Sequence, residues 1–157
     1  MKLNIGIADK NLKGAVSVLN QLLADEHVLY MKLRNYHWHV TGPTFSELHK
    51  LFESQYDEIE GAIDDIAERT RSLGGNALGT LKEMLQSAKL KETPGNSLKA
   101  EKMVTNLLLD HEAIIRQLRV GLETCMDEYG DMGTSDFLTG LMEKHEKMAW
   151  MLRACLL

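Results

Sequence analysis

Four long stretches of this chain repeat apolar residues every three or four positions, and this repetition constrains the fold more than any other feature. Over residues 11–40 the repeated positions are Val16, Leu19, Leu22, Leu23, Leu29, Leu33 and Tyr36. This spacing places the apolar side chains along one face of an α-helix of roughly thirty residues. Comparable stretches cover residues 44–73, 98–129 and 136–156. Four amphipathic helices of this length predict an all-α fold in which they pack as a four-helix bundle.

Glycine and proline mark where the first two long helices end. Gly42-Pro43 ends the first helix, because proline does not continue a helix and glycine lets the chain turn. Gly74-Gly75 ends the second. The chain contains only two prolines, which leaves the long apolar repeats free of interior helix breakers.

The connection between the second and third long helices is expected to contain one short helix. Residues 78–90 have an amphipathic pattern, and the turn after them contains Asn96 and Ser97, either of which can cap the third long helix. Residues 130–135 are expected to separate the third long helix from the fourth. At 157 residues the chain is long enough for one domain with a full core. We therefore predict a single helical domain over residues 1–157, with the short helix in a crossover connection.

Composition and charge exclude several classes of protein. The chain has no apolar run of about 18 residues, so no membrane-spanning helix is expected. No basic segment followed by an apolar one opens the chain, so no secretory leader is expected. Cys125 and Cys155 lack Cys-x-x-Cys spacing, which favours reduced thiols in a cytoplasmic protein over a disulfide. The net charge of −5 argues against general binding of nucleic acids and permits attraction of cations.

The second long helix carries a stripe of metal-binding residue types within an arc of about 100°. Its members are His49, Glu53, Glu60, Asp64 and Glu68. Such a stripe is most often a solvated acidic face, but His49 and Glu53 stand four residues apart, which lets two side chains grip one ion. Asp64 and Glu68 repeat this spacing, and His37 lies just before the turn that opens the helix. Imidazole together with carboxylate suits iron, zinc or manganese, whereas calcium prefers oxygen ligands alone.

One copy of the chain cannot close a site from this stripe. Glu53 and Asp64 are separated by about 16 Å along a helix axis, whereas metal–ligand bonds are only about 2 Å long. The two clusters can share a metal if two copies of the second helix pack antiparallel across a two-fold axis. A di-iron centre inside one bundle typically uses two Glu-x-x-His pairs. None of the six histidines has a glutamate three residues earlier, so such an internal centre is not expected.

Two segments of the chain resemble the signatures of the Dps family, the starvation-induced mini-ferritins. The first, HWHVTGPTFSELHKLFE, carries His37, His49 and Glu53 at the family's separations. The second, DDIAERTRSLGGNA, carries Asp64 and Glu68. The resemblance extends from residue 16 to residue 152, which is nearly the whole chain.

This resemblance implies a fold, an assembly and a function. It implies a ferritin-like four-helix subunit that assembles into a dodecameric shell, with a ferroxidase centre on each two-fold dimer interface. By residue match, His37, His49 and Glu53 come from one subunit, and Asp64 and Glu68 come from its neighbour. The implied function is that of a mini-ferritin, which oxidises Fe(II) with hydrogen peroxide, stores ferric mineral in its cavity and protects against oxidative damage.

The resemblance also implies acidic channels through the shell. Asp127, Asp131 and Asp136 cluster where the third long helix ends and the fourth begins, in the region that lines the family's pores. Gly130 and Gly133 in the same segment support the alternative, an ordinary polar turn.

The remaining histidines are expected to play no part in the chemistry. Trp38 matches a family tryptophan beside the iron site, but His39 is not at a ligand position and is expected to be exposed. His145 is also expected to be exposed. His27 and His111 have apolar neighbours in the sequence and are expected to be structural.

DNA binding is expected to be weak or absent at physiological salt, despite the family's name. Relatives that bind DNA usually do so through a mobile lysine-rich tail, but residues 1–10 contain only Lys2 and Lys10. The salt-sensitive affinity of a protein for DNA depends on the number of phosphates it neutralises. Avidity from many subunits is the argument on the other side, and a gel-shift titration decides between them.

Two other functions stay open from the sequence. A non-catalytic nucleoid or scaffold protein, built as a helical bundle, would carry the same stripe as a solvated surface. A catalase-like dimanganese protein would release oxygen from peroxide without accumulating ferric mineral. Iron oxidation kinetics separate these alternatives, because only the ferroxidase depends on the predicted ligands to form ferric species.

Overall fold

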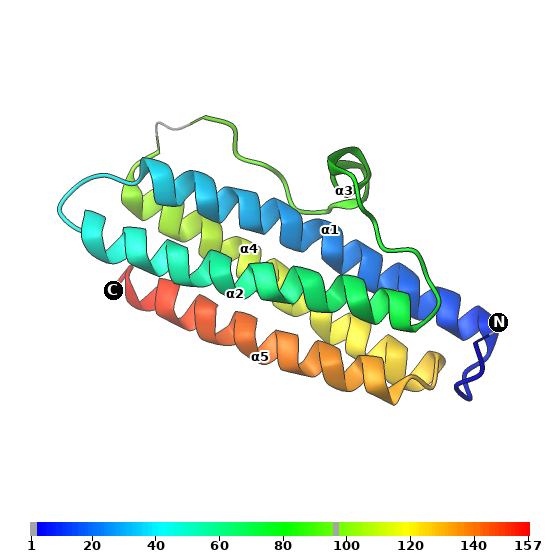
Figure 1. Ribbon diagram of the computed structural model, residues 1–157. Coiled ribbons are helices and arrows are strands. Elements are labelled where there is room, and N and C mark those ends of the chain that lie inside the picture. Colours follow the sequence, from blue (N-terminus) through cyan, green and yellow to red (C-terminus); the bar gives the residue numbers. More distant parts are fainter. Residues whose placement is uncertain (1–2, 96–97) are drawn as a thin grey trace.

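The computed structural model describes residues 3–95 and 98–157, and it confirms an all-α four-helix bundle (Figure 1). The long helices are α1 (Asp9–His39), α2 (Phe45–Ser72), α4 (Ala100–Glu123) and α5 (Met132–Ala154). The two short elements are α3 (Leu81–Ser87), between α2 and α4, and a π-helical turn, η1 (Thr124–Glu128), directly after α4. The predicted short helix in the connection between the second and third long helices is therefore confirmed.

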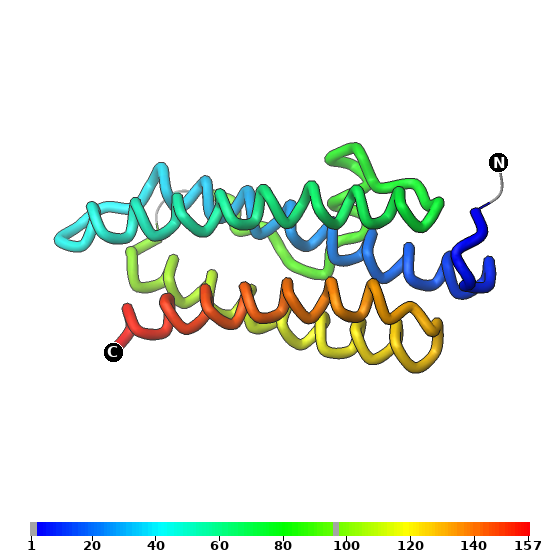
Figure 2. The backbone as a smooth tube through the Cα atoms, turned by 60° about the horizontal axis from the view of Figure 1, so that its bottom comes forward, coloured from blue at the N-terminus to red at the C-terminus, as the bar shows by residue number. Residues whose placement is uncertain are grey.

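Two helical hairpins make up the bundle. Helices α1 and α2 form one antiparallel pair, α4 and α5 form the other, and the two pairs lie as separate layers in Figure 2. Fully buried apolar side chains from all four long helices fill the space between them, among them Leu22, Leu29, Phe52, Ile59, Leu107, Ile114 and Leu138. The crossover runs along α1, so the α1–α2 turn, the start of α4 and the C-terminus share one end of the bundle (Figure 1).

A buried aspartate holds the crossover connection against α1. Asp25 is fully buried, and its Oδ1 accepts hydrogen bonds from the backbone N–H groups of Lys89 at 2.6 Å and Leu90 at 2.8 Å. Gln21 donates from Nε2 to the backbone carbonyl of Ser87 at 2.6 Å. These bonds satisfy backbone groups at the end of α3 and just after it, and so fix the connection on the bundle.

Helix α3 is shorter than the pattern over residues 78–90 predicts. It begins directly after Thr80, because Thr80 and Glu83 form a capping box in which each side chain accepts a hydrogen bond from the other residue's backbone N–H. The hydrogen bond from the Thr80 side chain, together with backbone hydrogen bonds, also lowers the pKa of Glu83. Asn96 and Ser97, the predicted caps of the next long helix, lie outside the described residues.

The boundary between α4 and α5 also differs from the sequence prediction. The break is predicted over residues 130–135, but in the structure it covers residues 129–131, and α5 begins at Met132. Gly130 has a φ of 64°, which favours glycine. Asp131 then caps α5, because its Oδ1 accepts a hydrogen bond from the Thr134 N–H at 2.9 Å.

Three titratable side chains form a buried hydrogen-bonded network between the two hairpins. His145 donates from Nε2 to Glu26 Oε1 at 2.9 Å, and His111 Nδ1 lies 2.9 Å from His145 Nδ1. All three side chains are at most 1% exposed. The prediction of an exposed His145 is therefore wrong, because α5 turns this residue toward Glu26 on α1. His111 is buried, as its apolar neighbours in the sequence suggest.

The hydrogen-bonding capacity of this buried network is only partly used. Burial, followed by the charge of His145, holds the pKa of His111 well below its ordinary value, so the His111 ring stays neutral. Among the described residues, Glu26 Oε2 and His111 Nε2 have no hydrogen-bond partner. A buried carboxylate depends on its remaining partner to offset the loss of water, so the Glu26–His145 contact is energetically sensitive.

The two cysteines agree with the prediction of unpaired thiols. Cys125 is buried in the bundle and Cys155 is exposed near the C-terminus, and both are free. Burial raises the pKa of the Cys125 thiol to about 11, which keeps it protonated near neutral pH. Over residues 3–95 and 98–157, no helix combines the length and hydropathy needed to cross a bilayer.

Candidate metal centre

His37 and His49 hold each other in place across the turn between α1 and α2. His37 lies in the last turn of α1 and His49 near the start of α2. His37 donates from Nδ1 to the backbone carbonyl of His49 at 2.8 Å, and His49 donates from Nδ1 to the backbone carbonyl of His37 at 2.9 Å. The two rings stack, with centroids 3.7 Å apart and planes 20° from parallel. We call these two residues the histidine pair.

The reciprocal hydrogen bonds decide which nitrogen of each ring is free. A carbonyl oxygen can only accept, so Nδ1 of each ring carries the hydrogen. Nε2 of a neutral ring then keeps its lone pair, which is the form that binds a metal. A bond from the other nitrogen to a carbonyl orients a metal-binding histidine and sets its tautomer. The histidine pair therefore presents two preorganised metal ligands.

Local sequence explains why the chain can place these rings together. Gly42 has a φ of 111°, a left-handed value that a residue with a Cβ adopts only with strain, and it lets the chain reverse within a few residues. The Val40 N–H donates to the Tyr36 carbonyl at 2.8 Å and so closes the end of α1. On the other side of the turn, the Phe45 ring lies 5.1 Å from the His49 ring. The glycine is thus needed for the geometry of the histidine pair.

Glu53 follows His49 by four positions on α2 and is exposed. Its Oε1 accepts a hydrogen bond of 3.5 Å from the Tyr56 hydroxyl. The Tyr56 ring in turn stands nearly perpendicular to the His37 ring, at 87° and 5.3 Å between centroids. Sequence reasoning missed Tyr56, although its position three residues after Glu53 places it on the same face of the helix.

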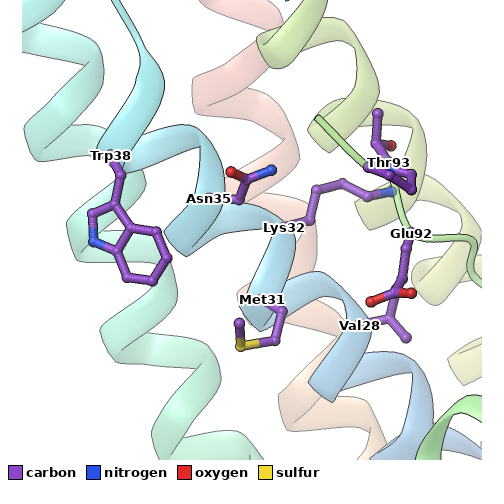
Figure 3. Close-up of a pocket in the computed structure, with 8 residues that line it drawn as sticks. Val28, Met31, Lys32, Asn35, Trp38, Glu92 and Thr93 are labelled. Carbon is purple, nitrogen blue, oxygen red and sulfur yellow. The ribbon is translucent and has the colours of Figure 1, made fainter. Parts of the chain in front are cut away.

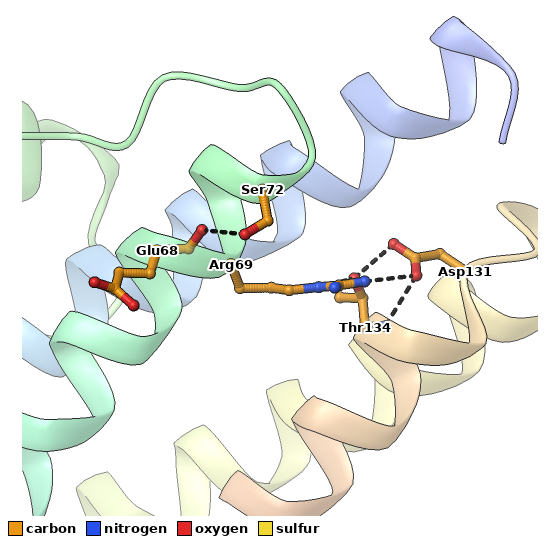
Figure 4. Close-up of polar contacts among 5 residues, drawn as sticks. All are labelled: Glu68, Arg69, Ser72, Asp131 and Thr134. Atoms are coloured by element: carbon orange, nitrogen blue, oxygen red, sulfur yellow. Dashed lines mark hydrogen bonds and ion pairs between the residues drawn. The ribbon is translucent and has the colours of Figure 1, made fainter. Parts of the chain in front are cut away.

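Asp64 and Glu68 lie further along α2 and are also exposed. Asp64 lines an open groove of about 700 Å³, together with His27 and Glu60 and with apolar residues of α1 and α3. The Glu68 carboxylate points away from α5, whereas the next side chain, Arg69, reaches toward α5 (Figure 4). Both carboxylates therefore face away from the other hairpin.

The structure does not bring the two ends of the stripe together within one chain. Asp64 lies eleven positions after Glu53 on the uninterrupted helix α2, which is about 16 Å along its axis. In the part of the chain that the structure describes, no three His, Cys, Asp or Glu side chains are grouped to hold a metal ion. A second copy is needed to complete any centre that uses both ends.

The spacing of the stripe has the symmetry that such a pairing requires. The midpoint between His49 and Glu68 and the midpoint between Glu53 and Asp64 both fall between Glu58 and Ile59. Two antiparallel copies of α2 related by a two-fold axis at this point bring His49 level with the partner's Glu68. They bring Glu53 level with the partner's Asp64 in the same register, because an isologous interface repeats every contact.

The three candidate pore carboxylates differ in their surroundings. Asp131 is buried and is committed within the chain: its Oδ1 accepts from Arg69 Nη2 at 3.0 Å, and its Oδ2 from the Thr134 hydroxyl (Figure 4). Arg69 also donates from Nε to the Thr134 hydroxyl at 3.0 Å. Asp127 and Asp136 are exposed. A helix cap with a guanidinium partner accounts for Asp131, so Asp127 and Asp136 are the better candidates for a channel.

A hollow of about 340 Å³ beside α1 lacks the chemistry of a metal site (Figure 3). Its lining includes the apolar surfaces of Met31 and Trp38, and Trp38 is 56% exposed. The buried Lys32 amine in the same lining is already paired with Asp110 at 2.5 Å. His39, which the sequence predicted to be exposed, is instead half-buried at the end of α1, where its Nδ1 donates to the Asn35 carbonyl.

Comparison with known proteins shows that the chain is similar to ferritin-like proteins. The ferritin-like domain family matches residues 16–156. An uncharacterized low temperature-induced protein of Nostoc is 49% identical, over 98% of this chain and 86% of its own length. The DNA protection during starvation protein 2 of Bacillus anthracis is 42% identical, over 92% and 97%. A crystal structure from Vibrio cholerae O1 superimposes with a TM-score of 0.92 at 33% identity, covering 100% and 98%. It is described as a DPS protein and a member of a broad superfamily of ferritin-like diiron-carboxylate proteins.

Proposed function

This chain belongs to the Dps family of ferritin-like proteins, and from that premise we propose that it is an iron-storage ferroxidase. Its substrates are Fe(II) and hydrogen peroxide, and its product is ferric mineral inside a dodecameric shell. His37, His49 and Glu53 bind iron from one side of a two-fold interface. The partner's Asp64 and the partner's Glu68 bind it from the other.

The observation that carries this proposal is the histidine pair. Each Nδ1–H is taken by a backbone carbonyl, which leaves two Nε2 lone pairs for a metal that accepts nitrogen ligands. A solvated acidic face, as in a scaffold protein, does not require two histidines to orient each other across a glycine turn. The geometry of the pair therefore favours the ferroxidase over the scaffold.

The five residues divide the chemistry between nitrogen and oxygen ligands. The imidazoles suit Fe(II), and the carboxylates stabilise the higher charge of Fe(III) as electrons leave. Two Fe(II) ions give up one electron each, hydrogen peroxide accepts both together with two protons, and two waters form. Because both electrons go to one peroxide, no hydroxyl radical is released. The ferric ions then pass into the cavity of the shell.

Location and charge fit this role. The net charge of −5 per chain favours the accumulation of cations around an assembled shell. We place the protein in the cytoplasm, where its two free thiols, Cys125 and Cys155, stay reduced.

Anaerobic loading followed by peroxide tests the function. The protein is loaded with Fe(II), one equivalent of peroxide per two iron ions is added, and the absorbance of ferric species is followed. We expect His37→Ala and Asp64→Ala each to slow oxidation by at least about 10- to 100-fold, because each removes a metal ligand and loss of even an outer partner of a ligand typically has an effect of that size. The matched control is His39→Ala, which changes a neighbouring histidine outside the ligand set.

Three outcomes count against this proposal. Equal rates in the wild type, His37→Ala and Asp64→Ala would support the scaffold alternative. Oxygen release without ferric product would support the dimanganese alternative. An assembled mass far from that of a dodecamer would contradict the proposed shell, whatever the rates.

Iron is expected to reach the cavity through an acidic channel at the junction of η1 and α5. Asp136 is exposed there and close to the start of α5, and we expect Asp136→Asn to slow iron uptake at low Fe(II) by about threefold to tenfold, since each lost charge weakens attraction of the cation. Stopped-flow uptake at low and high salt measures this effect, which salt should reduce. Unchanged uptake with an intact shell would remove Asp136 from the path.

A further inference from the structure

A cluster of aromatic rings around one arginine lies next to the proposed centre and has no role in the chemistry described above. The Arg34 guanidinium carbon lies 5.1 Å from the Tyr56 ring centroid, 5.4 Å from that of Trp38 and 5.5 Å from that of Tyr30. Arg34 also donates from Nη1 to the Tyr30 hydroxyl at 2.7 Å. A cation held over aromatic faces is attracted by each of them. The cluster therefore restrains the rings that surround Arg34, including Tyr56.

Tyr56 connects this cluster to the metal-binding side chains. One side of its ring meets Tyr30 at 86° and 6.1 Å between centroids. It also meets His37 at 87° and 5.3 Å, and perpendicular packing of this kind is a favoured geometry for aromatic rings. Its hydroxyl donates to Glu53 Oε1 at 3.5 Å. Tyr56 thus contacts two of the three proposed ligands that the same chain supplies.

Each of these contacts restricts a side-chain conformation that metal binding would otherwise have to order. The hydrogen bond from His37 Nδ1 to the His49 carbonyl decides the tautomer of His37. The Tyr56 ring restricts rotation of the His37 imidazole. Glu53 is exposed on α2, so its carboxylate has several rotamers available, and the hydroxyl favours one of them. Ordering a long side chain costs conformational entropy, and preorganised ligands avoid that cost on binding.

The Tyr56 hydroxyl is placed to donate to a ligating carboxylate, because a tyrosine hydroxyl carries a hydrogen and the Glu53 carboxylate accepts it. An outer group that donates to a ligating carboxylate typically affects metal affinity by about 10- to 100-fold. The contact between the Tyr56 hydroxyl and Glu53 is long, at 3.5 Å. We therefore expect its loss to change metal affinity by an amount at the low end of that range or below it.

We propose that Tyr56 is a positioning residue for the metal centre, which orients the His37 ring through its own ring and the Glu53 carboxylate through its hydroxyl. Arg34 acts one step further out, by holding Tyr56 between the aromatic rings. This inference rests on the function proposed above, because it assumes that His37 and Glu53 bind metal.

Cobalt(II) binding to the assembled protein tests this role without any oxidation. Titration with a competing chelator gives the Co(II) affinity, and the visible absorption bands of Co(II) report the geometry of its ligands. We expect Tyr56→Phe to weaken Co(II) binding by about threefold to tenfold, because the hydroxyl contact is lost while the ring stays. We expect Tyr56→Leu to weaken it by about 10- to 100-fold and to shift the bands, because the contact with His37 is lost as well.

Two further variants make this result specific. Arg34→Gln should change affinity in the same direction as Tyr56→Phe, since Tyr56 loses the cation that holds it. Tyr129→Phe is the matched control, because Tyr129 lies at the other end of the bundle, against Gly14. The Co(II) affinity and absorption spectrum of this variant should equal those of the wild type. Circular dichroism and assembled mass verify that each variant is folded.

The outcomes separate this inference from the function on which it rests. If wild-type Co(II) binding is lost in His49→Ala but is unchanged in affinity and spectrum in both Tyr56 variants, the positioning role is wrong and the metal centre stands. An equal effect of Tyr129→Phe would also contradict the positioning role. If the wild type shows no Co(II) binding that His49→Ala removes, the proposed metal centre itself is wrong.

Discussion

Mixing two inactive variants should restore iron oxidation at about a quarter of the wild-type number of sites. One variant is His37→Ala/His49→Ala, and the other is Asp64→Ala/Glu68→Ala. In the pairing described above, each mixed dimer has one centre with all five ligands and one centre that keeps only Glu53. Random mixing in equal amounts makes about half of the dimers mixed, and half of their centres are complete. Each parent alone should oxidise iron no faster than the uncatalysed reaction.

The recovery depends on which residues are combined, and this provides the control. Glu53→Ala removes a ligand from the same side of the centre as the histidine pair, so mixing it with His37→Ala/His49→Ala should restore nothing. The subunits are dissociated, mixed and reassembled, and native mass spectrometry verifies that the shells contain both chains. Verified mixed shells without any recovery would show that the two ends of α2 do not share a metal.

Replacing His145 by leucine should destabilise the protein by about 3–5 kcal/mol, because it leaves the Glu26 carboxylate buried without its partner. Glu26→Leu should cost less, about 1–3 kcal/mol, since the imidazole that remains is able to stay neutral. Both groups are almost fully buried and 2.9 Å apart. The double variant should therefore be more stable than the sum of the single effects predicts, by about 1 kcal/mol or more.

Urea unfolding at one fixed protein concentration measures these values, because the stability of an assembled protein depends on concentration. The control is Ile59→Val, a small change to a fully buried apolar residue on α2, which should cost about 1 kcal/mol. It should also add to the effect of His145→Leu without coupling. Full additivity of the Glu26 and His145 variants would show that their contact contributes little.

The same unfolding experiment should depend on pH through His111. The folded-state pKa of His111 is held well below its unfolded value of about 6.5, so the unfolded chain binds a proton that the folded chain refuses. The contribution of His111 to stability is therefore complete above about pH 6.5 and is lost as the pH falls toward the folded pKa. Its slope reaches at most about 1.4 kcal/mol per pH unit, and His111→Leu should remove this part of the pH dependence.

Much of the fold was predictable because its signal is local. The repeat of apolar residues over residues 11–40 reports the face that must be buried, and Gly42-Pro43 reports a turn that few other residues allow. The boundaries were less predictable where a distant side chain takes part. Asp131 begins α5 early because its carboxylate binds both Thr134 and Arg69, and Arg69 belongs to another helix.

Side-chain environment was the least predictable property. His145 has charged neighbours on both sides in the sequence, which is typical of an exposed segment. Its imidazole is nevertheless buried against Glu26. Which face of α5 turns inward depends on how the two hairpins pack, and a partner 119 positions away leaves no trace in the local pattern. For the same reason, Tyr56 could be placed near Glu53 from the sequence, but its contacts with His37 and Arg34 could not.

By itself, the sequence determined the helical class, the order of the helices and the positions of the candidate ligands along α2, because helix geometry converts residue spacing directly into distance and direction. It also determined that one chain cannot join both ends of the stripe. Only the tertiary structure decided that His37 and His49 exchange hydrogen bonds with each other's backbone and so leave both Nε2 atoms free. That arrangement depends on the path of the chain through the α1–α2 turn, where two helices meet at one angle among many that the sequence pattern allows.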